Sequence, residues 1–226
     1  MTHLTGADIV SRVRRTINEA RVNDSEFYTG ADEAELDSII AAHVLEALNF
    51  VHGTADPDLL DAGETATHVT GTRELGSYFV GVVAVPGYLR LKSLRVQGWS
   101  KALTEMQSDE EDEYAKQSDR YACGTPERPA AFLSVNLENG ERQIELYSLP
   151  KIDSSVRVEY MTFVEDTGAD DGIDVSTKLE DAYIYYLSGL VLTVLNDQHA
   201  DDMFNLAMAL MGVSAQEKQE KGGVRW

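Results

Sequence analysis

Hydrophobic periodicity changes twice along this chain, and this change limits the possible folds more than any other feature. Near both ends, apolar residues recur every three or four positions, as they do in amphipathic helices. Between these regions, apolar and polar residues alternate in short runs that stop at glycine or proline, as in strands joined by turns. The order helices, strands, helices predicts an α+β fold rather than an alternating α/β fold.

Two helices are expected in the first quarter of the chain. Thr5 and Asp8 have the spacing of a capping box at the start of a helix-period pattern. A second helix is expected from about Asp32 to Gly53, where a C-cap glycine belongs. Each of these helices has an apolar face that needs a partner.

The middle of the chain is expected to form antiparallel strands. The dipeptide Asn139-Gly140 is a hairpin signal between two of them. A short acidic-to-basic segment at 108–117 favours an exposed helix, because that order of charges complements the helix dipole. The expected strands lie at 78–85, 89–96, 131–137, 143–149 and 155–163.

Helical periodicity returns at Thr177 after a loop of Gly and Asp at 166–174. The helix that follows is apolar on nearly all sides, so it is expected to be central, and a last helix follows it. We therefore predict a helical bundle from the N- and C-terminal helices, an inserted antiparallel β domain and an extended C-terminal arm. The boundaries are 1–55 with 175–214 for the bundle, 56–174 for the β-rich domain and 215–226 for the arm.

The net charge limits the kinds of molecule that this protein can bind. Asp and Glu number 39 against 19 Lys and Arg, which gives a formal charge of −20. Such a protein repels phosphate backbones, so we expect no affinity for nucleic acid through basic contacts. A single cysteine, Cys123, excludes an internal disulfide. The N-terminus has no signal-peptide pattern, and no apolar window is long enough to cross a membrane.

The residues give no positive reason to expect an enzyme, a metal or a cofactor. His43 and His52 are nine residues apart on one helix, which is too far for one metal ion. His199 with Asp201 and Asp202 fits a helix start better than a ligand set. The acidic runs lack the EF-hand spacing, and Cys123 has no histidine near it in sequence.

Two features suggest contact with a partner. Trp99 lies in a locally basic stretch with Arg90, Lys92 and Arg95, which suits an acidic surface on a neighbouring copy. A solvated strand face explains the same cations equally well. The second feature is the polar tail, which ends in Val224-Arg225-Trp226, residue types that often anchor interfaces. An unstructured terminus is the alternative.

Three stretches in this order resemble the head–tail connector adaptors of tailed bacteriophages, the group that includes the tail tubular proteins of short-tailed phages and the first ring proteins of crAss-like phages. Together they cover most of the chain. The resemblance lies in the residue types and in their order along the chain, and it includes no set of catalytic residues. The first is Val85-Pro86-Gly87-Tyr88-Leu89-Arg90-Leu91 through Val96-Gln97-Gly98-Trp99. The second is Glu113-Tyr114 leading to Gly124-Thr125-Pro126-Glu127-Arg128-Pro129. The third is Ile144-Glu145-Leu146-Tyr147-Ser148-Leu149-Pro150, Val156-Arg157-Val158-Glu159-Tyr160 and the helix with Asp181-Ala182-Tyr183 and Tyr186.

The resemblance implies a structural virion protein at the head–tail interface, assembled in the host cytoplasm. Such adaptors form a ring, usually twelve-fold, beneath the portal protein and carry the next ring or tail proteins. Viral DNA passes through the lumen without sequence-specific binding, and the C-terminal arm contacts the portal. This arm is short here, which leaves the depth of its docking open. The alternatives from other classes are a tail-associated receptor- or carbohydrate-binding module, with Tyr78, Phe79, Tyr88 and Trp99 lining a glycan site, and a hydrolase.

Overall fold

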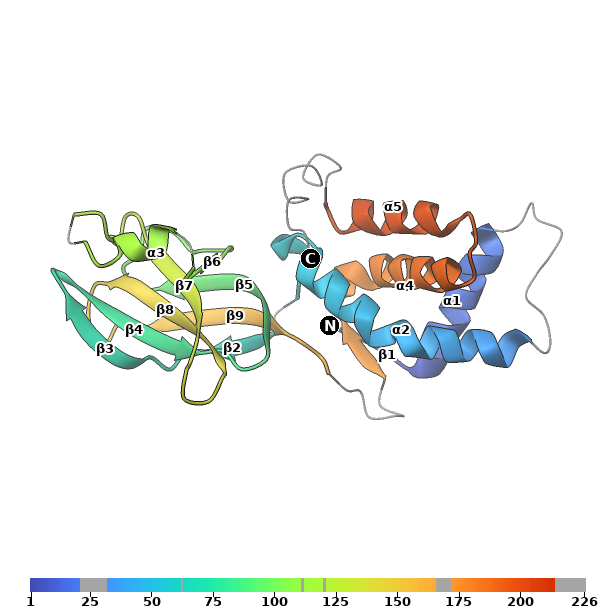
Figure 1. Cartoon of the computed structure of the whole chain (residues 1–226), viewed down its shortest axis with the longest axis horizontal. Helices are drawn as coiled ribbons and strands as arrows, with labels where there is room; N and C mark the ends of the chain where they lie inside the picture. Colours follow the sequence, from blue (N-terminus) through green and yellow to red (C-terminus); the bar gives the residue numbers. More distant parts are fainter. Residues whose placement is uncertain (21–31, 62, 111, 120, 166–171, 214–226) are drawn as a thin grey trace. The chain divides into compact units, whose positions relative to one another are not determined.

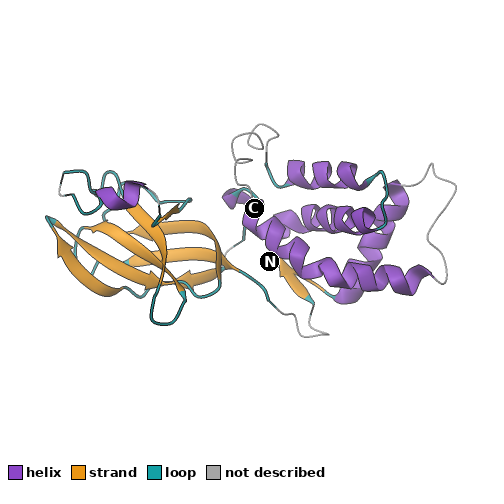
Figure 2. Cartoon of the chain, in the orientation of Figure 1, coloured by secondary structure: helices purple, strands orange, loops and turns teal. Residues whose placement is uncertain are grey.

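The computed structural model describes residues 1–20, 32–61, 63–110, 112–119, 121–165 and 172–213, and it is a mixed α and β structure (Figure 1). These residues form five α-helices, two short 3-10 helices and ten strands in three sheets (Figure 2). The chain divides into two compact units. We call Met1–Asp61 with Val164–Trp226 the helical unit and Ala62–Phe163 the β unit.

The helical unit is built around one central helix. α4 (Glu180–Val194) packs against α1 (Gly6–Ala20), α2 (Asp32–Thr54) and α5 (Ala200–Leu210). Its central position agrees with the apolar residues on nearly all its sides, since Tyr183, Leu187 and Val191 are fully buried. Gly189 permits the close approach of α5, because a Cβ atom there would lie 2.7 Å from the Phe204 ring.

The start of α1 confirms the predicted capping box. The Thr5 backbone N–H donates to Asp8 Oδ2, and the Asp8 N–H donates to Thr5 Oγ1, each at 3.2 Å. These two bonds satisfy N–H groups that a helix N-terminus leaves without a partner inside the helix. The hydrogen bonds from Thr5 also lower the pKa of Asp8.

The helical unit also contains strands and 3-10 turns that the sequence pattern did not predict. β1 (Thr2–Leu4) pairs antiparallel with β10 (Ile173–Val175), and η1 (Pro57–Leu59) and η2 (Thr177–Leu179) complete the unit. β10 falls partly in the segment expected to be a loop.

The unit boundaries also differ from the expected ones, because 56–61 and 164–174 belong to the helical unit. Two side chains of that unit bind these segments. Asn49 exchanges two hydrogen bonds of 2.8 and 2.9 Å with the backbone of Val164. Asp61 accepts from the Thr177 N–H at 2.7 Å.

Two sheets build the β unit around a shared core. One has the order β2 (Glu64–Ala66), β9 (Val156–Thr162), β5 (Tyr88–Val96). The other has the order β3 (Thr70–Leu75), β4 (Tyr78–Ala84), β8 (Arg142–Leu149), β7 (Ala130–Val135), β6 (Gln107–Ser108). Buried residues from both sheets, such as Leu91 and Val158 from the first and Val83 and Ile144 from the second, form one cluster.

The expectation of antiparallel strands holds for all pairs in the described residues except β6 with β7, which run parallel. β6 is only two residues long and enters from the long connection after β5, so no hairpin forces it to be antiparallel. The expected helix at 108–117 is shorter, α3 (Asp112–Lys116).

Candidate interaction surfaces

Trp99 lies in the turn after β5, half-buried against the core of the β unit. Its Nε1 atom donates a hydrogen bond of 3.1 Å to the backbone oxygen of Ser148. Ser148 is buried, has a φ of 65°, and lies at a bulge where β8 has one residue more than β4. Within the β unit, the hydrogen bond of Trp99 to Ser148 and its packing against the core hold this bulge in place.

The predicted cations lie along β5, and the structure brings a fourth cation beside them. Arg95 is exposed and pairs directly with Arg157 of β9 across the sheet. Arg90 and Lys92 are half-exposed and precede Arg95 on the same strand. We call Arg90, Lys92, Arg95 and Arg157 the basic strip.

One carboxylate, Glu159, lies within the basic strip. Its pairing partner across the sheet is Ser93, whose hydroxyl donates a hydrogen bond of 2.9 Å to Glu159 Oε2. Arg157 forms an ion pair of 2.6 Å with the same carboxylate. Desolvation raises the pKa of Glu159, whereas the hydrogen bond from Ser93 and the charges of Arg157 and Lys92 lower it. The lowering effects are larger in sum, so the pKa lies below its usual value and the group is ionised at neutral pH.

The negative charge of the chain is divided unequally between the two units. The helical unit has 24 Asp and Glu against 8 Lys and Arg, a net charge of −16. The β unit has 15 against 11, a net charge of −4, which completes the −20 of the whole chain. Strong negative charge is therefore a property of the helical unit, while the β unit carries the basic strip.

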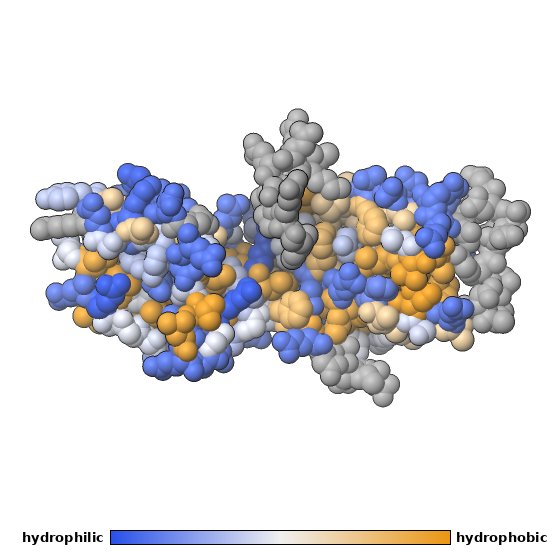
Figure 3. Space-filling view, viewed as in Figure 1, coloured by the Kyte–Doolittle hydropathy of each residue, from blue (hydrophilic) through white to orange (hydrophobic). Residues whose placement is uncertain are grey.

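The helical unit combines this charge with exposed apolar side chains. Phe50 of α2, Val194 at the end of α4, and Leu206 and Leu210 of α5 are each between 36% and 48% exposed. The Phe50 ring stacks on that of Tyr186 with centroids 4.1 Å apart. Figure 3 shows hydrophobic residues gathered over the helices of this unit. The helical unit therefore exposes four large apolar side chains that come from three helices.

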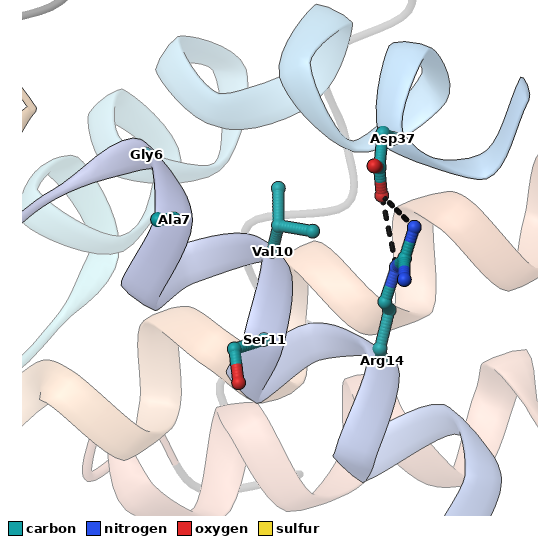
Figure 4. Close-up of a pocket in the computed structure, with 6 residues that line it drawn as sticks. All are labelled: Gly6, Ala7, Val10, Ser11, Arg14 and Asp37. Carbon is teal, nitrogen blue, oxygen red and sulfur yellow. Dashed lines mark hydrogen bonds and ion pairs between the residues drawn. The ribbon is translucent and has the colours of Figure 1, made fainter. Parts of the chain in front are cut away.

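A shallow groove of about 550 Å³ lies between α1 and α2 (Figure 4). Small side chains of α1 line most of it, and Arg14 reaches from α1 to Asp37 of α2. Arg14 Nε donates to Asp37 Oδ1 at 2.9 Å, and the second guanidinium contact is 2.7 Å. Because the charged groups that line the groove pair with each other, their ion pair ties α1 to α2.

His52 is the most strongly perturbed histidine in the described residues. It is 3% exposed, and its Nε2 atom accepts a hydrogen bond of 3.2 Å from the Ser176 N–H. Burial lowers the pKa of His52 to about 4, although the nearby charge of Asp61 acts in the opposite direction. Asp61 itself accepts from the Thr177 N–H, which holds the pKa of its carboxyl well below the usual value. His52 is therefore neutral at pH 7 and joins α2 to the segment before η2.

The other groups considered as ligands or nucleophiles lie in separate places. His43 pairs with Glu46 of its own helix at 2.7 Å. His199 immediately precedes α5, with Asp201 and Asp202 in the first turn, as expected of a helix start. Cys123 is half-buried. Among the described residues, no three His, Cys, Asp or Glu side chains form a group that could hold a metal ion.

The aromatic residues considered for a glycan site belong largely to the core of the β unit. Tyr88 is 7% exposed, Phe79 packs against the same cluster as Trp99, and Tyr78 is half-buried.

Several predicted functional residues lie outside the described part of the chain. They are Val224, Arg225 and Trp226, which belong to 214–226. The predicted portal contact of the C-terminal arm stays a prediction.

Within the described residues, no helix is both long enough and apolar enough to span a bilayer. No known family model matches this chain, and a search of curated proteins found no significant match.

Proposed function

We propose that this chain is a head–tail connector adaptor of a tailed phage. Copies of it dock as a ring on the tail-side face of the capsid portal and form the platform for later ring or tail proteins. The helical unit acts as the bundle that contacts the portal, and the β unit is the inserted antiparallel domain. The sequence resemblance supplies the class of partner.

The observation that supports docking most directly is the set of exposed apolar residues on a strongly acidic unit. Phe50, Val194, Leu206 and Leu210 come from three helices of the helical unit. These side chains are 36–48% exposed, so covering the rest of each one stabilises a complex by about 0.5–1.5 kcal/mol, under half of the value for a fully exposed side chain. The charge of the unit keeps the free subunit soluble until this surface is covered.

The charge distribution agrees with passage of DNA through a ring. A net charge of −16 on one unit disfavours contact with phosphates, so DNA can move past such a surface without adhering. In this proposal the protein acts mechanically, as a joint and a conduit, and it makes no sequence-specific contact with DNA.

The apolar surface can be tested by exchanging two leucines for aspartates. We expect the double variant Leu206→Asp/Leu210→Asp to weaken binding to the portal at least about tenfold, because each exchange places a charge in a desolvated contact. The matched control is Leu137→Asp/Ile152→Asp, which changes two exposed residues of the β unit, 98% and 56% exposed. Equal binding by both double variants would remove the helical surface from the proposal.

The arm is tested by a chain that ends at Ala215. We expect it to lose portal binding while the far-ultraviolet circular dichroism of the helices is unchanged, because the last described helix, α5, ends at Leu210 and is retained. Full binding by the shortened chain would show that the arm has no role.

A further inference from the structure

The basic strip has an excess of positive charge within its own sheet. Arg95 and Arg157 are directly paired across β5 and β9, and like charges in that position destabilise a sheet. The carboxylate of Glu159 forms an ion pair with Arg157 of this pair. Among the described residues, no carboxylate forms an ion pair with Arg95. A negatively charged partner would relieve this repulsion.

The helical unit offers a surface with the matching charge. Residues 180–213, which include α4 and α5, contain five acidic residues and no Lys or Arg. Asp201 and Asp202 are both exposed in the first turn of α5. In Figure 3 the edge of the helical unit over α5 is coloured as hydrophilic.

We infer that the basic strip binds the acidic α5 surface of a second copy of this chain. Arg95 and Arg157 face Asp201 and Asp202 in this contact, so two cations meet two carboxylates. The second copy is the favoured occupant because the charge complementarity lies within the chain itself, in a β unit with exposed cations and a helical unit of −16.

This contact joins two different surfaces, so it is a head-to-tail contact. A head-to-tail contact closes into a ring when its repeated rotation completes a full turn, and otherwise it gives an open filament. The inference therefore rests on the proposed ring and specifies how neighbouring subunits recognise each other, but its test needs no portal.

Sedimentation velocity of the full chain at increasing concentration measures the contact. At about 0.1 M salt the Debye length is about 10 Å, so the general repulsion between acidic copies is screened while charges in contact still attract. We expect concentration-dependent association at this salt, and its loss near 1 M salt.

Charge reversal then identifies the two surfaces. We expect Arg95→Glu/Arg157→Glu to weaken self-association at least about tenfold, since attraction becomes repulsion. The matched control is Arg73→Glu/Lys151→Glu, which gives the same net charge by changing two exposed cations outside the strip. Asp201→Arg/Asp202→Arg should weaken association similarly, and the chain with all four exchanges should recover it to within about threefold.

Each outcome decides the inference. A sedimentation coefficient that does not change with concentration would overturn the inference. Equal association of Arg95→Glu/Arg157→Glu and of its control would also overturn it. A folded fourfold variant without recovery would remove α5 as the counterpart. If the self-association results came out as expected but the chain did not bind the portal, the proposed function would be refuted and the inferred contact between copies would stand.

Discussion

Protonation of His52 should control the stability of the helical unit in mild acid. Burial lowers the pKa of His52 from 6.5 to about 4 on folding, because the ring is 3% exposed. Between these two values the unfolded chain binds more protons than the folded chain, so stability falls as the pH falls. The loss is about 2 kcal/mol between pH 7 and pH 5 and about 3 kcal/mol by pH 4.

Urea unfolding at pH 7 and pH 5, followed by circular dichroism at 222 nm, measures this loss in the helices. His52→Gln retains an oxygen that can accept from the Ser176 N–H but does not titrate, so most of the loss should disappear. The control is His68→Gln, which changes an exposed histidine of the β unit and should leave the loss intact. If the His52→Gln variant lost as much stability between pH 7 and pH 5 as the original chain, the burial argument would be refuted.

Two further substitutions test the packing of each unit. Gly189→Ala should destabilise the helical unit by about 1–3 kcal/mol, because its Cβ atom would lie 2.7 Å from the Phe204 ring. Gly6→Ala is the control, since no atom lies within 4 Å of its added Cβ; equal effects in thermal unfolding would contradict the packing argument. Trp99→Phe should cost about 1–2 kcal/mol in unfolding of the β unit through loss of the bond to Ser148; an unchanged melting temperature would contradict its assigned role.

The sequence predicted the elements whose signal is local. The capping box of Thr5 and Asp8 marks the start of α1, and the apolar circumference of α4 indicated its central position. Both signals come from residues within a few turns of each other, so no tertiary information was needed.

Elements that depend on distant pairing were missed. β1 and β10 have three residues each and pair across some 170 positions of sequence, so neither has a detectable pattern of its own. β3 was missed because it has no buried residue and therefore no alternation of apolar and polar positions.

The candidate site was predictable only in part. The cations of β5 were evident in the sequence, but the pairing of Arg95 with Arg157 depends on the register between β5 and β9, which two irregularities shift. The role of Trp99 in the core was equally hidden, because its partner Ser148 lies 49 positions away on another sheet.

Cryo-electron microscopy of the full chain mixed with the portal protein encoded beside it tests the proposed connector role most directly. We expect a ring of added density on the tail-side face of the portal, with the helical unit against it. Folded protein that leaves the portal bare at concentrations well above those of the assembled particle would contradict the account.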